Sequence, residues 1–264
     1  MAVDYITLRF AGRTRLACVR ELCGADEAAV PDSSTGSAIR ILDRLLVDAG
    51  GCLQPGGADT LSGFDRDRLL AAVYRRAYAD RIDGTVTCRR CEKRFDLHFS
   101  LGELQSALDR ESAARGIDPD ADGLLRTSDG LAFRLPTGRD ECEAAALPPD
   151  AARGALADRL VDSSSRGATP EELDAALGQA APLLDLEMDA CCPECETHQP
   201  VRFNVQVYLL ESILRERRRL VSDVHRLATV YGWSRREILE LPRGDRRLHV
   251  ELIEGEHARR RPHL

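Results

Sequence analysis

The sequence predicts a mostly helical α+β fold in which two similar strand–helix–knuckle halves meet at four cysteines and a helical extension follows. Two Cys-x-x-Cys turns, called here the first knuckle (residues 88–91) and the second knuckle (residues 192–195), are separated by 104 residues. Apolar residues around them recur at the same spacing, which indicates an internal duplication. Beyond residue 204, apolar residues at three- and four-residue steps predict the helical extension.

The apolar residues before each knuckle have helical spacing, and those after it alternate as in a strand. The repeated positions are Leu69, Ala72, Val73, Leu97, Phe99 and Leu101, which recur as Leu173, Ala176, Leu177, Val201, Phe203 and Val205. We therefore expect each half to place a helix before its knuckle and a strand after it.

Each half is also expected to open with a strand and a Gly-x-Asp-Glu turn. Residues 5–10 alternate like a short strand, and residues 20–27 lead through Gly24 into an alanine-rich helical segment. Residues 131–141 have the same order around Gly138, again before alanines. The interval between turn and knuckle is shorter in the second half, so the two copies differ by a deletion in a loop.

Local signals mark the loops and one helix start. Residues 48–63 and 163–167 are rich in turn-forming residues, which predicts exposed loops. Thr169 can cap a helix, Pro170 suits its first position, and Glu172 completes a capping box.

The C-terminal segment predicts three helices. Residues 204–231 have the apolar spacing of one long amphipathic helix, which Gly232 can end. A capping box over residues 234–237 starts a short helix that ends at Pro242, and a last helix is expected at about residues 245–253. We therefore divide the chain into a first half (1–110), a second half (111–203) and a C-terminal helical segment (204–264).

Composition limits the class of protein. With 264 residues, 43% of them apolar, the chain can bury a substantial core. No run approaches the roughly 18 apolar residues of a membrane span, and the first ten residues lack the pattern of a secretory signal. Nine cysteines without such a signal favour a reducing compartment, so we expect a cytoplasmic protein without membrane contacts.

The knuckles predict a structural zinc site. Zn²⁺ prefers four soft or borderline ligands in a tetrahedron, and two Cys-x-x-Cys turns supply four thiolates. We assign Cys88, Cys91, Cys192 and Cys195 as the ligands of one zinc-ribbon-like site. Four protein ligands leave no open coordination position, so no catalysis at the metal is expected. Two residues remain alternative ligands for the second knuckle, namely Cys191 and His198.

The sequence contains none of the common catalytic motifs. We find no Gly-x-Ser-x-Gly elbow, phosphate-binding loop, dinucleotide fingerprint or His-Glu-x-x-His segment. The chain is therefore predicted not to be an enzyme and to have no small-molecule substrate. Its net charge of −7 disfavours nucleic acid as a general partner.

One stretch of the C-terminal segment carries a family resemblance. Residues 224–242, which include Tyr-Gly-Trp-Ser, resemble a segment of small phage baseplate and tail-assembly proteins, as do residues 20–27. Together with the two knuckles, the chain resembles the T-even phage baseplate hub assembly family, in the enlarged form associated with phage-derived contractile injection systems. The resemblance implies a non-enzymatic tail assembly or baseplate protein whose partners are a hub, spike or other tail protein. It also implies a cytoplasmic protein, free or incorporated into an assembled particle.

The aromatic corner between two predicted helices is the candidate partner surface. Tyr231 and Trp233 lie at this corner, together with Ile238 and Leu239 of the next helix. Aromatic side chains at such a position can anchor a partner or lock the two helices together. Two other functions remain open: a zinc-ribbon regulator that binds nucleic acid, and an enzyme that exchanges thiols through a cysteine pair.

Overall fold

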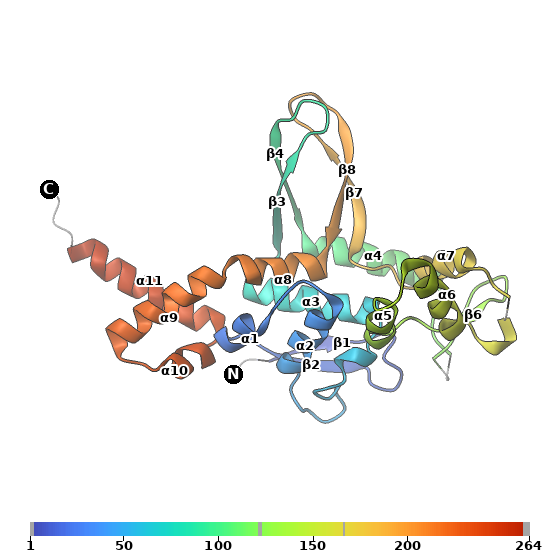
Figure 1. The fold of residues 1–264 in the computed structure, drawn as a ribbon, viewed down its shortest axis with the longest axis horizontal. Coiled ribbons are helices and arrows are strands. Elements are labelled where there is room, and N and C mark those ends of the chain that lie inside the picture. The colour runs from blue at the N-terminus through green and yellow to red at the C-terminus, as the bar shows by residue number, and fades with distance from the viewer. Residues whose placement is uncertain (1–2, 121–122, 166, 261–264) are drawn as a thin grey trace.

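The computed structural model describes residues 3–120, 123–165 and 167–260, and it has the predicted α+β fold with two duplicated halves (Figure 1). The elements of the first half are β1 (Val3–Thr7), β2 (Leu16–Arg20), α1 (Gly24–Ala29), α2 (Thr35–Leu45), the 3₁₀ turn η1 (Ala58–Thr60), α3 (Gly63–Ala77), β3 (Arg81–Thr87), β4 (Arg94–Ser100) and α4 (Leu101–Arg115). Strands β1 and β2 form one antiparallel hairpin, and β3 and β4 form another.

The second half repeats this order. Its elements are β5 (Leu125–Arg126), β6 (Ala132–Phe133), α5 (Gly138–Ala144), α6 (Pro149–Leu160), the 3₁₀ turn η2 (Ser163–Ser165), α7 (Pro170–Ala180), β7 (Asp185–Cys191), β8 (His198–Asn204) and α8 (Val205–Arg215). The repeated apolar residues before the knuckles lie in α3 and α7, so both are helical as predicted. The capping box at Thr169 and Glu172 is also confirmed.

The duplication is closest at the knuckle hairpins. Strand pairing in β7–β8 repeats that in β3–β4 residue by residue at the 104-residue spacing. The amide of Leu101 donates to the backbone carbonyl of Asp80, and the amide of Val205 donates to the backbone carbonyl of Leu184, both over 2.9 Å. Helix α8 is thus the counterpart of α4, although the division made from the sequence assigned α8 to the C-terminal segment.

The Gly-x-Asp-Glu turns are also duplicated. Arg20 donates two hydrogen bonds to Asp26, at 2.6 and 2.9 Å, and Arg134 donates two to Asp140, at 2.6 and 3.0 Å. In each half the aspartate also accepts a hydrogen bond from the backbone amide of the helix-capping residue, which is Cys23 or Thr137. The Arg134 guanidinium holds the pKa of Asp140 well below its usual range.

The prediction of one long helix over residues 204–231 is wrong, because the helix is interrupted at Glu216 between α8 and α9 (Arg217–Tyr231). The two helices bury their apolar faces in different cores. Leu209 and Ile213 of α8 pack in the main core, whereas Leu227 of α9 packs against α10 (Arg235–Glu240) and α11 (Arg243–Arg260). Gly232 ends α9 in the left-handed conformation (φ 69°), and the capping box at Ser234 starts α10, as predicted.

The main core is formed mostly by residues of the first half, and residues of the second half also pack in it. It unites β1, β2, α2 and α3 with Leu184, Phe203 and the buried face of α8. A smaller core joins Phe64 to the apolar residues of α6, α7 and the β5–β6 hairpin. Among the described residues, no helix has the length and apolar content needed to cross a membrane.

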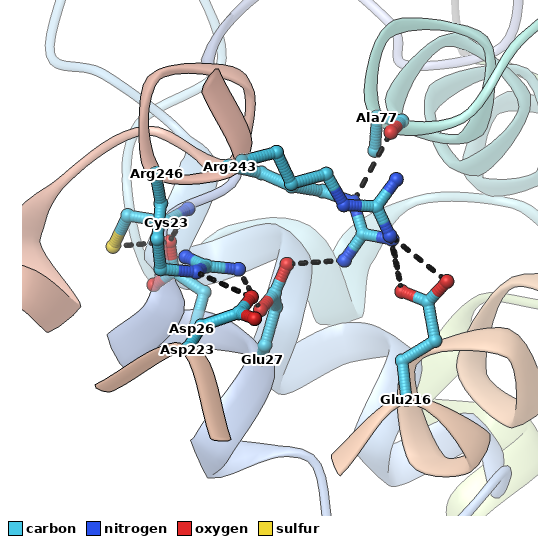
Figure 2. Close-up of polar contacts among 9 residues, drawn as sticks. Cys23, Asp26, Glu27, Ala77, Glu216, Asp223, Arg243 and Arg246 are labelled. Carbon is cyan, nitrogen blue, oxygen red and sulfur yellow. Dashed lines mark hydrogen bonds and ion pairs between the residues drawn. The ribbon is translucent and has the colours of Figure 1, made fainter. Parts of the chain in front are cut away.

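Buried ion pairs attach the C-terminal helices to the first half. Arg243 and Arg246 of α11 are 2% and 1% exposed, and both contact the carboxylate of Glu27 in α1 (Figure 2). Arg243 also donates to the carbonyl of Ala77 over 3.1 Å and pairs with Glu216. The interruption between α8 and α9 therefore places Glu216 where it meets α11.

The start of α11 repeats the start of α3, a duplication that the sequence analysis did not identify. The residues Leu61, Asp65 and Arg66 recur as Leu241, Asp245 and Arg246, 180 positions later. Arg66 pairs with Glu141 of the second Gly-x-Asp-Glu turn over 2.7 Å, just as Arg246 pairs with Glu27 of the first turn. Each turn thus receives the start of a helix from another part of the chain, in the same way.

This packing explains the glycine at the first turn and gives a testable prediction. A Cβ atom on Gly24 would lie 2.9 Å from Arg246 Nη1 and 3.2 Å from the backbone Cα of Leu239. Because Arg246 is buried, we expect Gly24→Ala to destabilise the protein by about 1–3 kcal/mol in urea unfolding. The control is Gly154→Ala in α6, where a Cβ meets nothing within 4 Å and the change is expected to stabilise the helix. Equal stability of the two variants would contradict this account.

Candidate metal centre

The hairpins β3–β4 and β7–β8 form an arm that projects from the body of the molecule, and their tips meet (Figure 1). Near the base of the arm, the equivalent residues Phe99 and Phe203 pack edge to face with ring centroids 5.0 Å apart. At the tip, the two knuckles form a small separate core with Phe95 and Ala190. The arm is therefore joined to the main core only at its base.

Both knuckles have the same backbone conformation. The amide of Cys88 donates to the backbone carbonyl of Lys93 over 2.9 Å, and the amide of Cys192 donates to the backbone carbonyl of Thr197 over 3.0 Å. The residues after the second cysteines, Glu92 and Glu196, are left-handed with φ of 59° and 55°. This tight turn directs both thiols of each knuckle towards the other hairpin.

The four predicted cysteines are brought together. The Sγ atoms of Cys88 and Cys195 lie 3.6 Å apart, those of Cys91 and Cys192 lie 3.8 Å apart, and all four lie within 4.8 Å of one another. A tetrahedron with Zn–S bonds of about 2.3 Å requires sulfurs about 3.8 Å apart. Since Cys88 and Cys192 are 1% and 0% exposed, the cluster fits a closed tetrahedral metal site.

The protein favours negative charge at part of the cluster. The Thr197 hydroxyl, 3.3 Å from Cys195 Sγ, and the Thr197 amide lower the pKa of Cys195 to about 6. Hydrogen bonds from the backbone amides of Cys91 and Arg90 lower the pKa of Cys88. At Cys91 the Lys93 amide favours the thiolate, but burial and the neighbouring sulfurs outweigh it and raise the pKa to about 12. Four adjacent thiolates repel one another, so a divalent cation is the counter-charge that lets all four ionise.

The two alternative ligands lie outside the cluster. Cys191 is exposed, and its Sγ is 3.9 Å from the carbonyl oxygen of Cys192. His198 contacts Asp189 through Nδ1 over 2.5 Å, and both side chains are largely exposed. The second knuckle therefore contributes Cys192 and Cys195, as the 104-residue spacing predicts.

Gln199 joins the two hairpins beside the cluster and was missed by the sequence analysis. Its Oε1 accepts from the Arg89 amide over 2.8 Å, and its Nε2 donates to the Thr87 carbonyl over 3.1 Å. Gln199 is 5% exposed, and its equivalent in the first half is the apolar Phe95. A polar residue at one copy of an otherwise apolar repeated position was the available signal.

We expect Gln199→Leu to weaken metal retention while leaving the four thiols in place. The substitution removes the Gln199 partner of two backbone groups in part-buried contacts, at a cost of about 1 kcal/mol each or less. Loss of a residue that orients metal ligands typically lowers metal affinity by about tenfold or more. Competition with a chromogenic chelator measures this, and Gln179→Leu on the exposed surface of α7 is the control. Identical metal loss from both variants would show that Gln199 does not support the centre.

The candidate partner residues do not form one surface. Ile238 is completely buried between α9 and α11, so its side chain locks these helices together. Tyr231, 40% exposed, stacks on Trp233 with ring centroids 4.8 Å apart, and His249 of α11 packs against both rings. Leu239 is half-buried on another side of α10, close to Gly24 of α1.

No protein-family model, curated protein or solved structure matches this chain. The four cysteines are the one group of His, Cys, Asp or Glu side chains, within the described ranges, whose ligand atoms gather closely enough to hold a metal ion. Their closed arrangement suits a structural metal that joins the two hairpins.

Proposed function

We propose that this chain is a non-enzymatic assembly or baseplate protein of a phage-like contractile injection system. A structural zinc ion holds its projecting arm together, and its helical end binds a hub, spike or other tail protein. The protein acts in the cytoplasm, either free or as part of an assembled particle. It contributes binding surfaces rather than chemistry.

One observation carries this proposal: the two segments that resemble baseplate assembly proteins form a single structural unit. Residues 20–27 run from the end of β2 into α1, and residues 224–242 run from the second half of α9 through α10. Helix α1 contacts both α9 and α10, and Cys23 forms a β-bridge with Pro242. Two segments from opposite ends of the sequence that pack against each other can form one binding surface, which is what an assembly protein requires.

The metal centre supports a structural role for zinc. Four buried or half-buried thiols at tetrahedral spacing leave no position for a substrate or an activated water. The arm has too small a core to hold two hairpins together without a crosslink. Zinc therefore supplies rigidity to a part of the molecule that projects into solvent.

A second function is favoured by the charge of the first knuckle. Arg89, Arg90 and Arg94 are exposed at the tip of the arm, where a zinc-ribbon regulator would contact nucleic acid. The second knuckle opposes this charge, because Glu194 pairs with Lys93 over 2.7 Å. The mixed charge of the tip makes this the weaker proposal.

Co-purification tests the proposed function. The tagged chain is co-expressed with the sheath, tube, spike and wedge genes of a contractile system from the same genome, and the captured proteins are identified by mass spectrometry. We expect capture of a hub or spike component. Capture of no tail protein, combined with retardation of DNA or RNA at near-physiological salt, would overturn the proposal in favour of the zinc-ribbon regulator. Trp233→Ala, run in parallel, tests whether the aromatic corner contributes to this capture.

A further inference from the structure

A groove of about 670 Å³ runs between α1, α9 and α10, separate from the aromatic corner. It is lined by aliphatic and basic side chains of α9 and α10, together with Ala28 of α1. A second hollow of about 390 Å³ continues it past Leu239 and Arg235 towards Ala25. The groove therefore overlaps the unit formed by the two segments that carry the family resemblance, because Val224, His225, Arg235 and Leu239 lie within residues 224–242.

The floor of the groove is apolar and partly uncovered. Val221 is 66% exposed, whereas Leu220, one position earlier, is buried. Val224 and Leu239 are half-buried beside them. An isolated exposed apolar side chain is ordinary, but a concave row of aliphatic side chains is typical of a site that receives apolar side chains of another molecule.

The rim of the groove carries only basic side chains. Arg217, His225 and Arg235 line it, and none of the residues that line the main groove carries a carboxylate. This contrasts with the whole chain, whose net charge is −7. In the adjoining hollow the one carboxylate, Glu240, is paired with Arg236 over 2.8 Å. The charge of the groove is therefore local and opposite to that of the rest of the protein.

We propose that this groove binds an acidic amphipathic helix of a partner protein. Aliphatic side chains of that helix lie on the floor, and its Asp and Glu side chains pair with the arginines of the rim. From Arg217 to His225 the groove follows α9 for about 12 Å, which matches about two turns of a bound helix. The proposal deepens the proposed function and rests on it, because it gives the chemistry by which the helical end recognises a tail protein.

Two other occupants fit the groove less well. Nucleic acid would use the basic rim but leave the aliphatic floor uncovered, and its phosphates gain nothing from that floor. In a symmetric dimer through this groove, the basic rim of one copy would face the basic rim of the other, and the two chains, each of net charge −7, would repel each other. Both are tested as outcomes below.

The test uses a fluorescent synthetic helix with leucine on one face and glutamate on the others, and the full-length protein loaded with zinc. We expect saturable binding by fluorescence anisotropy that weakens as salt increases. Val221→Glu, which places a carboxylate on the floor, is expected to weaken binding about tenfold or more, equivalent to at least about 1.4 kcal/mol. Val230→Glu is the matched control, because Val230 is 47% exposed on the same helix but does not line the groove.

Several results would overturn the proposal. The first is equal binding of a peptide in which lysine replaces glutamate, and the second is an equal loss of binding in Val221→Glu and Val230→Glu. A dimer that forms without the peptide and that Val221→Glu dissociates would identify a second copy of the chain as the occupant. DNA binding that Arg235→Glu abolishes would identify nucleic acid as the occupant. Because the probe contains no tail protein, its binding is independent of the co-purification result. Peptide binding by a chain that captures no tail protein and retards DNA or RNA would leave the groove established and overturn only the proposed function.

Discussion

Cys192→Ser is expected to release the zinc ion, one per chain, and to unfold the arm while the body of the protein stays folded. Cys192 is completely buried, and its Sγ lies within 4.8 Å of the other three cysteine sulfurs. A structural zinc of this type contributes on the order of 10 kcal/mol to the folding of the segment that holds it. The tip has a core of its own that is separate from the main core. Loss of the metal therefore removes most of the stabilisation of the two hairpins but little of that of α2, α3 and α8.

Hydrogen exchange and metal analysis check this result. We expect the purified protein to contain one zinc per chain and the variant to contain none. Amide protection should vanish over most of residues 82–99 and 186–203 and persist in α3 and α8. Cys191→Ser is the matched control, since this exposed neighbour lies outside the cluster and its loss should leave both zinc and protection unchanged.

Two outcomes would contradict this prediction. If the protein binds two zinc ions and Cys192→Ser loses only one, each knuckle has its own metal. If Cys192→Ser loses zinc but keeps full protection along the arm, the hairpins are held by Phe99, Phe203 and Gln199 without the metal.

Glu27→Ala is expected to destabilise the whole protein by about 3–5 kcal/mol. Glu27 is 5% exposed and is the shared partner of Arg243 and Arg246, which are themselves buried. Removing its carboxylate leaves two buried guanidinium groups short of negative charge. Asp223, 3.8 Å from Arg246, and Glu216 compensate only in part. Urea unfolding monitored by circular dichroism measures the change.

The control for Glu27 is an exposed ion pair of the same C-terminal unit. Glu254 pairs with Arg226 and is largely exposed, so Glu254→Ala should change stability much less. Similar changes in both variants would show that the buried cluster contributes no more than a surface pair. A second check is Glu27→Gln, which keeps the size of the side chain but removes its charge and should still be clearly destabilising.

The buried ion pairs of Glu27 limit how partner binding by the C-terminal helices can be tested. Deleting residues 224–264 removes Arg243 and Arg246 and leaves the carboxylate of Glu27 without these partners. Such a truncation is expected to unfold part of the first half, so loss of a partner from it would not identify a binding surface. Single exposed substitutions such as Val221→Glu avoid this problem.

The sequence alone determined the duplication, the four clustered cysteines and the helix boundaries that carry a capping signal. Each of these depends on local chemistry: cysteine spacing within a turn, capping residues such as Thr169 and Ser234, and the left-handed Gly232. The 104-residue spacing also distinguished Cys192 from Cys191, because a duplicated hairpin keeps its register. These features can be predicted because the residues that decide them are close in the sequence or are copied exactly.

Only the tertiary structure decided which faces are covered and which charges are buried. Periodicity assigned residues 204–231 to one helix. The structure divides it at Glu216, because α8 packs in the main core and α9 packs against α10 and α11, and because Glu216 pairs with Arg243. Ile238 has the same apolar character as Leu239, yet one is buried and the other lines a groove. Burial and long-range ion pairing depend on how distant segments pack, and neither composition nor spacing along one segment contains that information.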